Sequence, residues 1–222
     1  MTTDELPVTD RTRLRRLREK GSRSRADLDA VLAAGFICHL GVLVDGSPRV
    51  MPTAYGVDGD TLYLHGSVAA RSLLAAPDAE ICVTVTHLDG IVLARSVFEH
   101  SFDYRSAMVY GVPRPVTDPR EKLRGLRTLT EQCAPGQWEY ARQPSRKELA
   151  ATTLLALELT EASVKISAGP PDDGDSPDAA LGLWAGNLPV TSSFGTPVPD
   201  PALPPGMEPP AHIRARAGGA LG

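Results

Sequence analysis

Polar and apolar residues alternate with a period of two over much of the chain, which is the pattern of half-buried β-strands. Three such runs follow one another, at residues 36–44, 49–57 and 61–65. Asp45-Gly46 and Asp58-Gly59 separate them. Aspartate–glycine pairs between such runs indicate tight hairpins, because glycine accepts positive φ without strain. The pattern predicts three consecutive antiparallel strands, with Pro52 at a bulge or an unpaired position.

Further strands are predicted downstream, at 80–88, 91–95 and 106–115, with one or two more within 152–167. Asp89-Gly90 indicates a turn between the first two of these. Segment 100–106, HSFDYRS, is predicted to be a loop whose polar side chains need hydrogen-bond partners. No strand–helix–strand rhythm occurs, which excludes a doubly wound nucleotide fold and favours a small closed barrel.

Short helices are expected at four places, within 26–34, 67–76 and 118–133 and after Ser145. Ser24 with Asp27 forms a candidate capping box for the first helix. Asp118 is the expected N-cap of the third helix, which Pro119 would open.

Composition narrows the class of protein. The 222 residues carry a formal net charge of −4. This charge predicts neither a nucleic-acid nor a membrane surface. Residues 11–25 are basic, and we interpret them as an arm that packs on acidic surface or at a cofactor's edge. The acidic N-terminus lacks an apolar leader, so we expect a cytoplasmic protein. Three scattered cysteines predict free thiols rather than a metal site.

We expect three parts: a basic arm at 1–25, a barrel domain at 26–190 and a Pro/Gly-rich, flexible tail at 191–222.

One candidate for binding chemistry is the junction where a strand ends at His65 and Gly66 and a helix begins near Ser67. Unpaired N–H groups at a helix start suit an anion. Arg71 and Ser72 lie one turn later and can donate to a phosphate, and Arg49 and Thr53 can converge on the same end. A capped helix with an exposed arginine fits this motif equally well.

The histidines leave haem open as an alternative, because a histidine near a strand end can ligate iron. His39, inside an apolar run, is predicted to be a hydrogen-bonded core residue, and His87 is predicted to be the same at the end of its strand.

Three ordered segments together resemble a known family. They are VDGSPRVMPTAYGVDGDTLYLHGSVAARS, TVTHLDGIVLARSVFEHSFDYRSAMVYG and WAGNLP. They are similar to the pyridoxamine 5′-phosphate oxidase-like, FMN-binding split-barrel proteins, in the branch akin to nitroimidazole-resistance reductases. The resemblance implies a mainly β fold with short helices, a six-stranded antiparallel split β-barrel, and FMN held in a homodimer.

The resemblance also implies roles for particular residues. It places Arg49, Thr53, His65, Gly66 and Ser67 along the flavin. It assigns the phosphate to Arg71 and Ser72. It places Tyr104, Arg105 and Ser106 beside the ring, and Trp184 as a cover from the partner subunit. Ala54 and Ser72 stand where the oxidases carry lysines, and the late arginine-rich segment has no counterpart, which argues against true pyridoxamine-phosphate oxidase activity.

The expected function is therefore an FMN-dependent oxidoreductase. It would act on a small flat substrate, with a nicotinamide donor and with no protein residue as general acid or base. A flavin or haem carrier or sensor without catalysis, and a reductase that uses a deazaflavin, are the alternatives on the same barrel.

Overall fold

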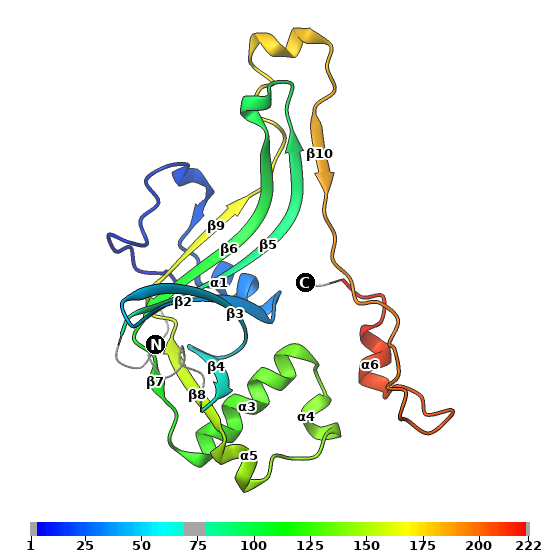
Figure 1. The fold of residues 1–222 in the computed structure, drawn as a ribbon. Helices are drawn as coiled ribbons and strands as arrows, with labels where there is room; N and C mark the ends of the chain where they lie inside the picture. The colour runs from blue at the N-terminus through cyan, green and yellow to red at the C-terminus, as the bar shows by residue number, and fades with distance from the viewer. Residues whose placement is uncertain (1–3, 69–78, 221–222) are drawn as a thin grey trace.

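The computed structural model, which describes residues 4–68 and 79–220, is an antiparallel barrel from which a long arm projects (Figure 1). The strands are β1 (Gly21–Ser22), β2 (Ile37–Val44), β3 (Ser47–Asp58), β4 (Thr61–Ser67), β5 (Ile81–Leu93), β6 (Ser101–Gly111), β7 (Arg114–Pro115), β8 (Thr152–Glu158), β9 (Ala162–Ser167) and β10 (Gly186–Pro189). The helices are η1 (Arg18–Lys20), α1 (Arg25–Ala33), η3 (Val97–Glu99), α3 (Pro119–Cys133), α4 (Gln137–Tyr140), α5 (Arg146–Ala150), η4 (Pro177–Leu181) and α6 (Ala211–Arg216).

The strands join in the order β1-β9-β6-β5-β2-β3-β4-β8-β7, and β10 pairs with β5. The predicted mainly antiparallel fold with short helices is confirmed. Among the described residues seven strands have six residues or more, one more than the expected six, and the short strands β1, β7 and β10 come in addition. β1 and β7 extend the sheet edges, and β10 lies on the arm.

The first hairpins form where the sequence predicts them. β2, β3 and β4 pair consecutively, and Asp45 and Gly46 adopt φ values of 52° and 73° between the first two. Two positive φ values in a two-residue loop define a turn whose twist matches the strands that it joins. Gly59, with φ 58°, closes the next hairpin.

The barrel interior holds one apolar core. Inward residues of the strands, such as Leu40, Tyr55 and Leu64, pack together, and Leu28 and Leu32 of α1 join the same core. α1 is capped by Ser24, whose side chain accepts a hydrogen bond from the Asp27 amide. Only half of the predicted capping box forms, because the Asp27 carboxylate accepts from the Ser22 hydroxyl instead.

α3 covers the outer face of β3, β4 and β8. It begins after Asp118 as predicted, and its Leu129 packs with Tyr63 and Leu154 in a second apolar cluster. The approach is close: a Cβ on Gly56 would lie 2.8 Å from the Leu129 backbone nitrogen. Glycine is required at this position for the helix to lie on the sheet.

Residues 88–104 and 168–190, which we call the arm, extend beyond the barrel (Figure 1). β5 continues through Asp89 and Gly90 with a β-bulge, so the predicted turn there is wrong. Gly90 is held between β6 and β10, where it pairs with Asp103 and Pro189. The predicted loop at 100–106 is also wrong, because β6 begins at Ser101 and pairs along this length with β5.

The tail returns from the arm to the barrel and contacts α4 (Figure 1). The sequence predicts no fixed structure after residue 190, and the structure places α6 there. His212 bonds through Nε2 to Oε1 of Gln137 at 2.9 Å, and Phe194 stacks on Phe36 with ring centroids 6.5 Å apart. The tail thereby contacts α4 at one point and the segment just before β2 at another.

Candidate functional site

Two cavities lie near each other where β2, β3 and β4 meet α3, α4 and the tail. The first, which we call the His65 cavity, has a volume of about 520 Å³. The second, which we call the Arg105 cavity, has a volume of about 590 Å³. Both volumes are typical of small-molecule sites. Ile37 lines the Arg105 cavity, and its registry partner Ala54 lines the His65 cavity. The two cavities therefore approach each other at this pair of neighbouring strands.

The His65 cavity has mostly apolar walls. Its lining residues come from β3, β4, α3, α4 and the segment that leads to α5: Ala54, His65, Leu126, Leu129, Thr130, Cys133, Ala134, Gln137, Trp138, Arg142, Pro144 and Glu148. α3 supplies one wall because its apolar stripe faces the sheet. Burial raises the pKa of Cys133, which therefore lines the cavity as a neutral thiol.

His65 is the one imidazole among the described residues that line this cavity. It points outward on β4, where it pairs with Leu154 of β8, while its neighbour Leu64 points into the core. The surrounding protein desolvates the ring and lowers the pKa of His65, although its side chain remains accessible from the cavity. Within residues 4–68 and 79–220 the ring has no hydrogen-bond partner. A neutral, unpartnered imidazole in an apolar cavity is suited to bind the metal of a bound cofactor.

An ion pair lies at the edge of the His65 cavity. Arg142 donates two hydrogen bonds to Glu148, at 3.0 and 2.6 Å. These bonds, with those from Ser145, lower the pKa of Glu148 to about 2. The cavity therefore combines an apolar interior with a charged edge, which suits a flat apolar molecule that carries polar substituents on one side.

The Arg105 cavity combines aromatic and charged groups. Phe36 and Ile37 line one side, and Arg105 lies with Asp89 on the other. The Arg105 guanidinium donates to both carboxylate oxygens of Asp89, each at 2.9 Å. This hydrogen-bonded carboxylate raises the pKa of Arg105, so the residue stays a cation. Hydrogen-bonding groups next to an apolar surface fit the polar edge and the face of a heterocycle.

The tail lines the Arg105 cavity and supports one wall of the His65 cavity. Val190, Thr191, Ser192 and Ala220 line the Arg105 cavity. α6 packs through His212 against Gln137, which lines the His65 cavity. Backbone hydrogen bonds join Gly218 and Gly219 to Phe194, so the two ends of the tail lie next to each other.

The predicted site residues divide between different faces. His65 lines one cavity and Arg105 the other. Gly66 and Ser67 complete β4 and pair with Thr153 and Thr152.

Arg49 and Thr53 do not join His65. Thr53 pairs with the buried Cys38, whose thiol donates to the Thr53 carbonyl. Arg49 is exposed, pairs with Val42, and lies five residues before Ala54 on β3, or roughly 17 Å at the rise of a strand.

The other predicted residues lie on the outer face or on the arm. Tyr104 and Ser106 alternate with the inward residues of β6, and the Lys165 ammonium lies 5.5 Å from the Tyr104 ring. Trp184 lies on the arm and is 70% exposed. Arg71, Ser72 and the helix predicted at 67–76 fall largely within 69–78, outside the described residues, so their phosphate role stays a prediction.

The histidines have different surroundings. His87 Nε2 donates to the Val31 carbonyl at 2.9 Å, as expected of a satisfied residue. His100 Nδ1 accepts from the Ala94 amide and ties the two strands of the arm together. His39 is exposed on the outer face of β2, so its predicted place in the core is wrong. Its inward neighbours are Cys38 and Leu40, which fill the core instead.

Several lining residues are not foreseen from the sequence. Trp138 and Arg142 follow the glycine turn at 136, and Asp89 sits at the bulge of β5. A tryptophan and an arginine in the short segment after an amphipathic helix are the only signal for the first two. Nothing local signals Asp89, because its role depends on pairing with β6.

A family model described as pyridoxamine 5′-phosphate oxidase matches residues 24–166. The chain belongs to this family. The match covers α1 and strands β2 to β9, and it ends before the arm's return strand and the tail. The family resemblance of the sequence is thereby confirmed, together with the split-barrel fold. A search of curated proteins found no match.

Two solved structures are similar over almost the whole chain. One is the flavocytochrome Anf3 from Azotobacter vinelandii, at 36% identity and a TM-score of 0.90, covering 97% of this chain and 100% of that one. The other is the FAD and heme binding protein from Mycobacterium smegmatis, at 40% identity and a TM-score of 0.86, covering 91% and 98%.

A protein assigned to 5-nitroimidazole antibiotic resistance, from Bacteroides thetaiotaomicron, shares the fold. It is 19% identical with a TM-score of 0.56, covering 66% of this chain and 86% of that one. Among the described helices, none is long and apolar enough to span a membrane.

Proposed function

We propose that the protein is a redox protein that binds a flavin in the Arg105 cavity and haem in the His65 cavity. The observation that carries this proposal is the unpartnered imidazole of His65 in an apolar cavity next to a second, polar-edged cavity. The two full-length relatives are a flavocytochrome and an FAD- and haem-binding protein, which supports the same pair of cofactors.

The His65 cavity has the residues that haem needs. His65 would bind the iron through a ring nitrogen, since its lowered pKa keeps the ring neutral. Leu126, Leu129 and Trp138 would pack on the porphyrin faces. Arg142 at the edge would offer a cation to a carboxylate, in competition with Glu148.

The Arg105 cavity fits a flavin. Arg105 and Asp89 would hydrogen-bond the polar edge of the ring, and Phe36 would pack on its face. The flavin supplies hydride and electron transfer when bound, and the protein's residues orient it and tune it. We take the flavin to be FAD rather than the FMN implied by the resemblance, because one full-length relative is named for FAD.

We also propose that the protein acts as a cytoplasmic homodimer. The outer face of β2, β3 and β6 exposes Ile37, Leu43, Val50 and Met108, by 37–71%. Exposed apolar residues gathered on one face are typical of an interface between subunits. Trp184 from the partner subunit would then reach a flavin, as the resemblance implies, and an isologous dimer would hold two such sites.

The test is reconstitution with FAD and haem, followed by absorption spectra. We expect flavin bands and a Soret band in the wild type. His65→Ala should lose the Soret band and keep the flavin bands. His39→Ala is the matched control, because it removes an exposed imidazole from β2, two strands away in the same sheet, and it should keep both. Absence of both cofactors from the wild type would overturn the proposal.

A second measurement separates an oxidoreductase from a carrier. The reconstituted protein is mixed anaerobically with NADH or NADPH, and flavin and haem absorbance are followed together. Reduction of the flavin and then of the haem is expected for a redox enzyme with neighbouring cofactors. Bound cofactors that neither nicotinamide reduces would favour the carrier, and competition between FAD, FMN and a deazaflavin identifies the ring that is preferred.

A further inference from the structure

The N-terminal arm encloses a third cavity, which shares no lining residue with the two cofactor cavities. Residues 4–23 fold back along β9, where Gly21 pairs with Lys165 and the Leu6 amide bonds to the Arg23 carbonyl at 2.7 Å. Arg11 pairs with Glu80 and Glu161, which confirms that the basic arm packs on acidic surface. Between these attachments the chain loops away from the sheet and leaves a hollow of about 390 Å³.

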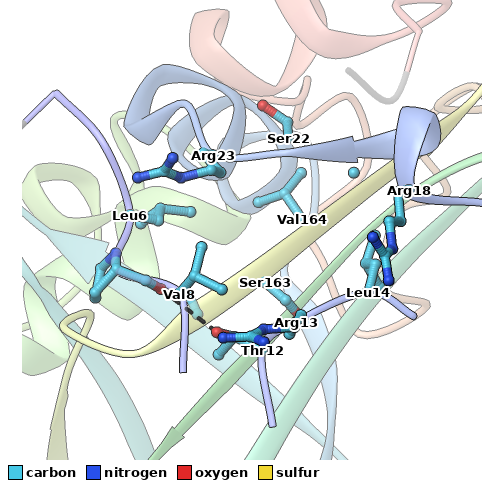
Figure 2. A pocket seen from close by; sticks show the side chains of 13 residues that line it. Leu6, Val8, Thr12, Arg13, Leu14, Arg18, Ser22, Arg23, Ser163 and Val164 are labelled. Carbon is cyan, nitrogen blue, oxygen red and sulfur yellow. Dashed lines mark hydrogen bonds between the residues drawn. The ribbon is translucent and has the colours of Figure 1, made fainter. Parts of the chain in front are cut away.

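Much of the lining of this hollow is apolar. Leu6 and Val164 are 4% and 1% exposed, and Pro7, Val8, Leu14 and Ala162 line it as well. Figure 2 shows Val164 lying between Arg23 on one side and Arg18 on the other, with Leu6 and Val8 below Arg23. The hollow can therefore take an apolar group of moderate size.

The charged residues that line the hollow are all arginines. Arg13, Arg18 and Arg23 line it, and the described lining residues include no carboxylate. Arg23 is paired with Glu5 at 2.8 Å, whereas Arg13 and Arg18 have no ion-pair partner among residues 4–68 and 79–220. Some arginines elsewhere, such as Arg25 and Arg114, are held by carboxylates. Arg13 and Arg18 differ from exposed arginines such as Arg15 and Arg16 because they line an apolar hollow.

We propose that this hollow binds a small amphiphilic anion, an apolar chain or ring that carries one carboxylate. The apolar part would lie on Leu6, Val8 and Val164, and the carboxylate would accept hydrogen bonds from Arg13 and Arg18. A guanidinium binds a carboxylate with two parallel hydrogen bonds, which gives both energy and orientation. Apolar lining alone would not select an anion, and charge alone would not need a hollow.

The test is calorimetric titration of the full-length protein with decanoate. Decanol supplies the chain without the charge, and inorganic phosphate supplies charge without the chain. We expect decanoate to bind and the other two to bind at least about tenfold more weakly. Failure of decanoate to bind the wild type, or equal binding of decanol, would overturn the proposal.

Two variants locate the binding. R13Q/R18Q removes the unpaired guanidinium groups, and V8D places a carboxylate at a side chain that is 45% exposed on the lining. Each should weaken decanoate binding about tenfold or more. R15Q/R16Q is the matched control, because it removes the same charge from the same loop at residues outside the lining. Equal weakening in the control would show general attraction to the basic arm and would contradict the site.

Discussion

The barrel and the arm use the same strands for opposite purposes. Within the barrel, β5 and β6 direct Val83 and Val109 into a core where both are fully buried. Beyond the bulge at Leu88 and Gly90 the same two strands leave the barrel. There Phe98 is 87% exposed and Trp184 is 70% exposed.

The difference shows where each region obtains its stability. The barrel buries the apolar side chains of its inward face against one another. The arm has two long strands, one four-residue strand and few buried side chains, and narrow ribbons of this kind are marginal in water. Its stability comes from the ion pair of Arg95 with the buried Asp173 and, in our proposal, from a second subunit.

The largest expected effect separates a core leucine from an arm leucine. Leu64→Ala should destabilise the protein by about 2–5 kcal/mol, because Leu64 is fully buried and a cavity remains. Leu188→Ala removes the same atoms from a residue that is 54% exposed on β10, and should change stability by about 0.5 kcal/mol or less. Urea unfolding of both variants checks the comparison, and similar losses would show that the arm has a core of its own.

The next effect concerns the proposed dimer. Phe98→Ser with Trp184→Ser should weaken dimerisation by about 2 kcal/mol or more, since buried aromatics dominate interfaces. Val198→Ser with Met207→Ser is the control, because these residues are equally apolar and exposed but lie outside the arm. Sedimentation velocity over a range of concentrations gives the dissociation constants. Equal dissociation constants for the two variants would show that the arm is not part of the dimer interface.

A smaller effect is expected inside the barrel at Tyr55. Its hydroxyl donates to the Leu32 carbonyl at 2.6 Å and is buried. Tyr55→Phe should lower the free energy of unfolding by about 1 kcal/mol. The loss stays small because Gln132 also donates to the Leu32 carbonyl. Thermal or urea unfolding measures it. Tyr104→Phe, on the outer face of β6, should be neutral. A neutral Tyr55→Phe would mean that Gln132 alone satisfies this carbonyl.

The smallest effect is confined to the arm and depends on pH. Burial acts to raise the pKa of Asp173, but hydrogen bonds from the Arg95 and Ser96 amides and from the Arg95 side chain outweigh it, so the pKa is lowered. A lowered folded pKa stabilises the arm above the unfolded value of about 3.9, and this stabilisation is lost as the pH falls through the folded value.

Trp184 fluorescence in a Trp138→Phe background reports on the arm in this experiment. We expect an acid transition below about pH 4 that Asp173→Asn abolishes. Asp175→Asn, an exposed neighbour, should leave the transition in place. A transition that survives Asp173→Asn would assign it to another group.

Two Asp-Gly pairs show how far local sequence determines the fold. Asp45-Gly46 forms the predicted turn, because the strands on either side are short and pair with each other. Asp89-Gly90 has the same chemistry but lies within a 13-residue strand. There β6 and β10 hold the chain extended. The glycine lies at a β-bulge, and its missing side chain lets the Leu188 carbonyl approach closely. Both partners are distant in sequence, so no local pattern reveals them.

The candidate site was predictable to a similar extent. The end of β4 is foreseen as a binding position, and His65 lines a cavity there. The walls from α4 and the tail are not foreseen, because they depend on contacts such as His212 with Gln137, 75 residues apart. Thr53 was expected at the same position, but strand alternation directs it away from Ala54.

The tail's route has a consequence for how the protein responds to proteases. The proline-rich link between Phe194 and α6 is exposed over most of residues 195–208, as protease-sensitive segments are. A single cut there would leave the strands of the barrel covalently intact and break the covalent link between Phe194 and α6. The cut piece would then be held by noncovalent contacts, such as those of Arg216 with the Phe194 ring and of His212 with Gln137.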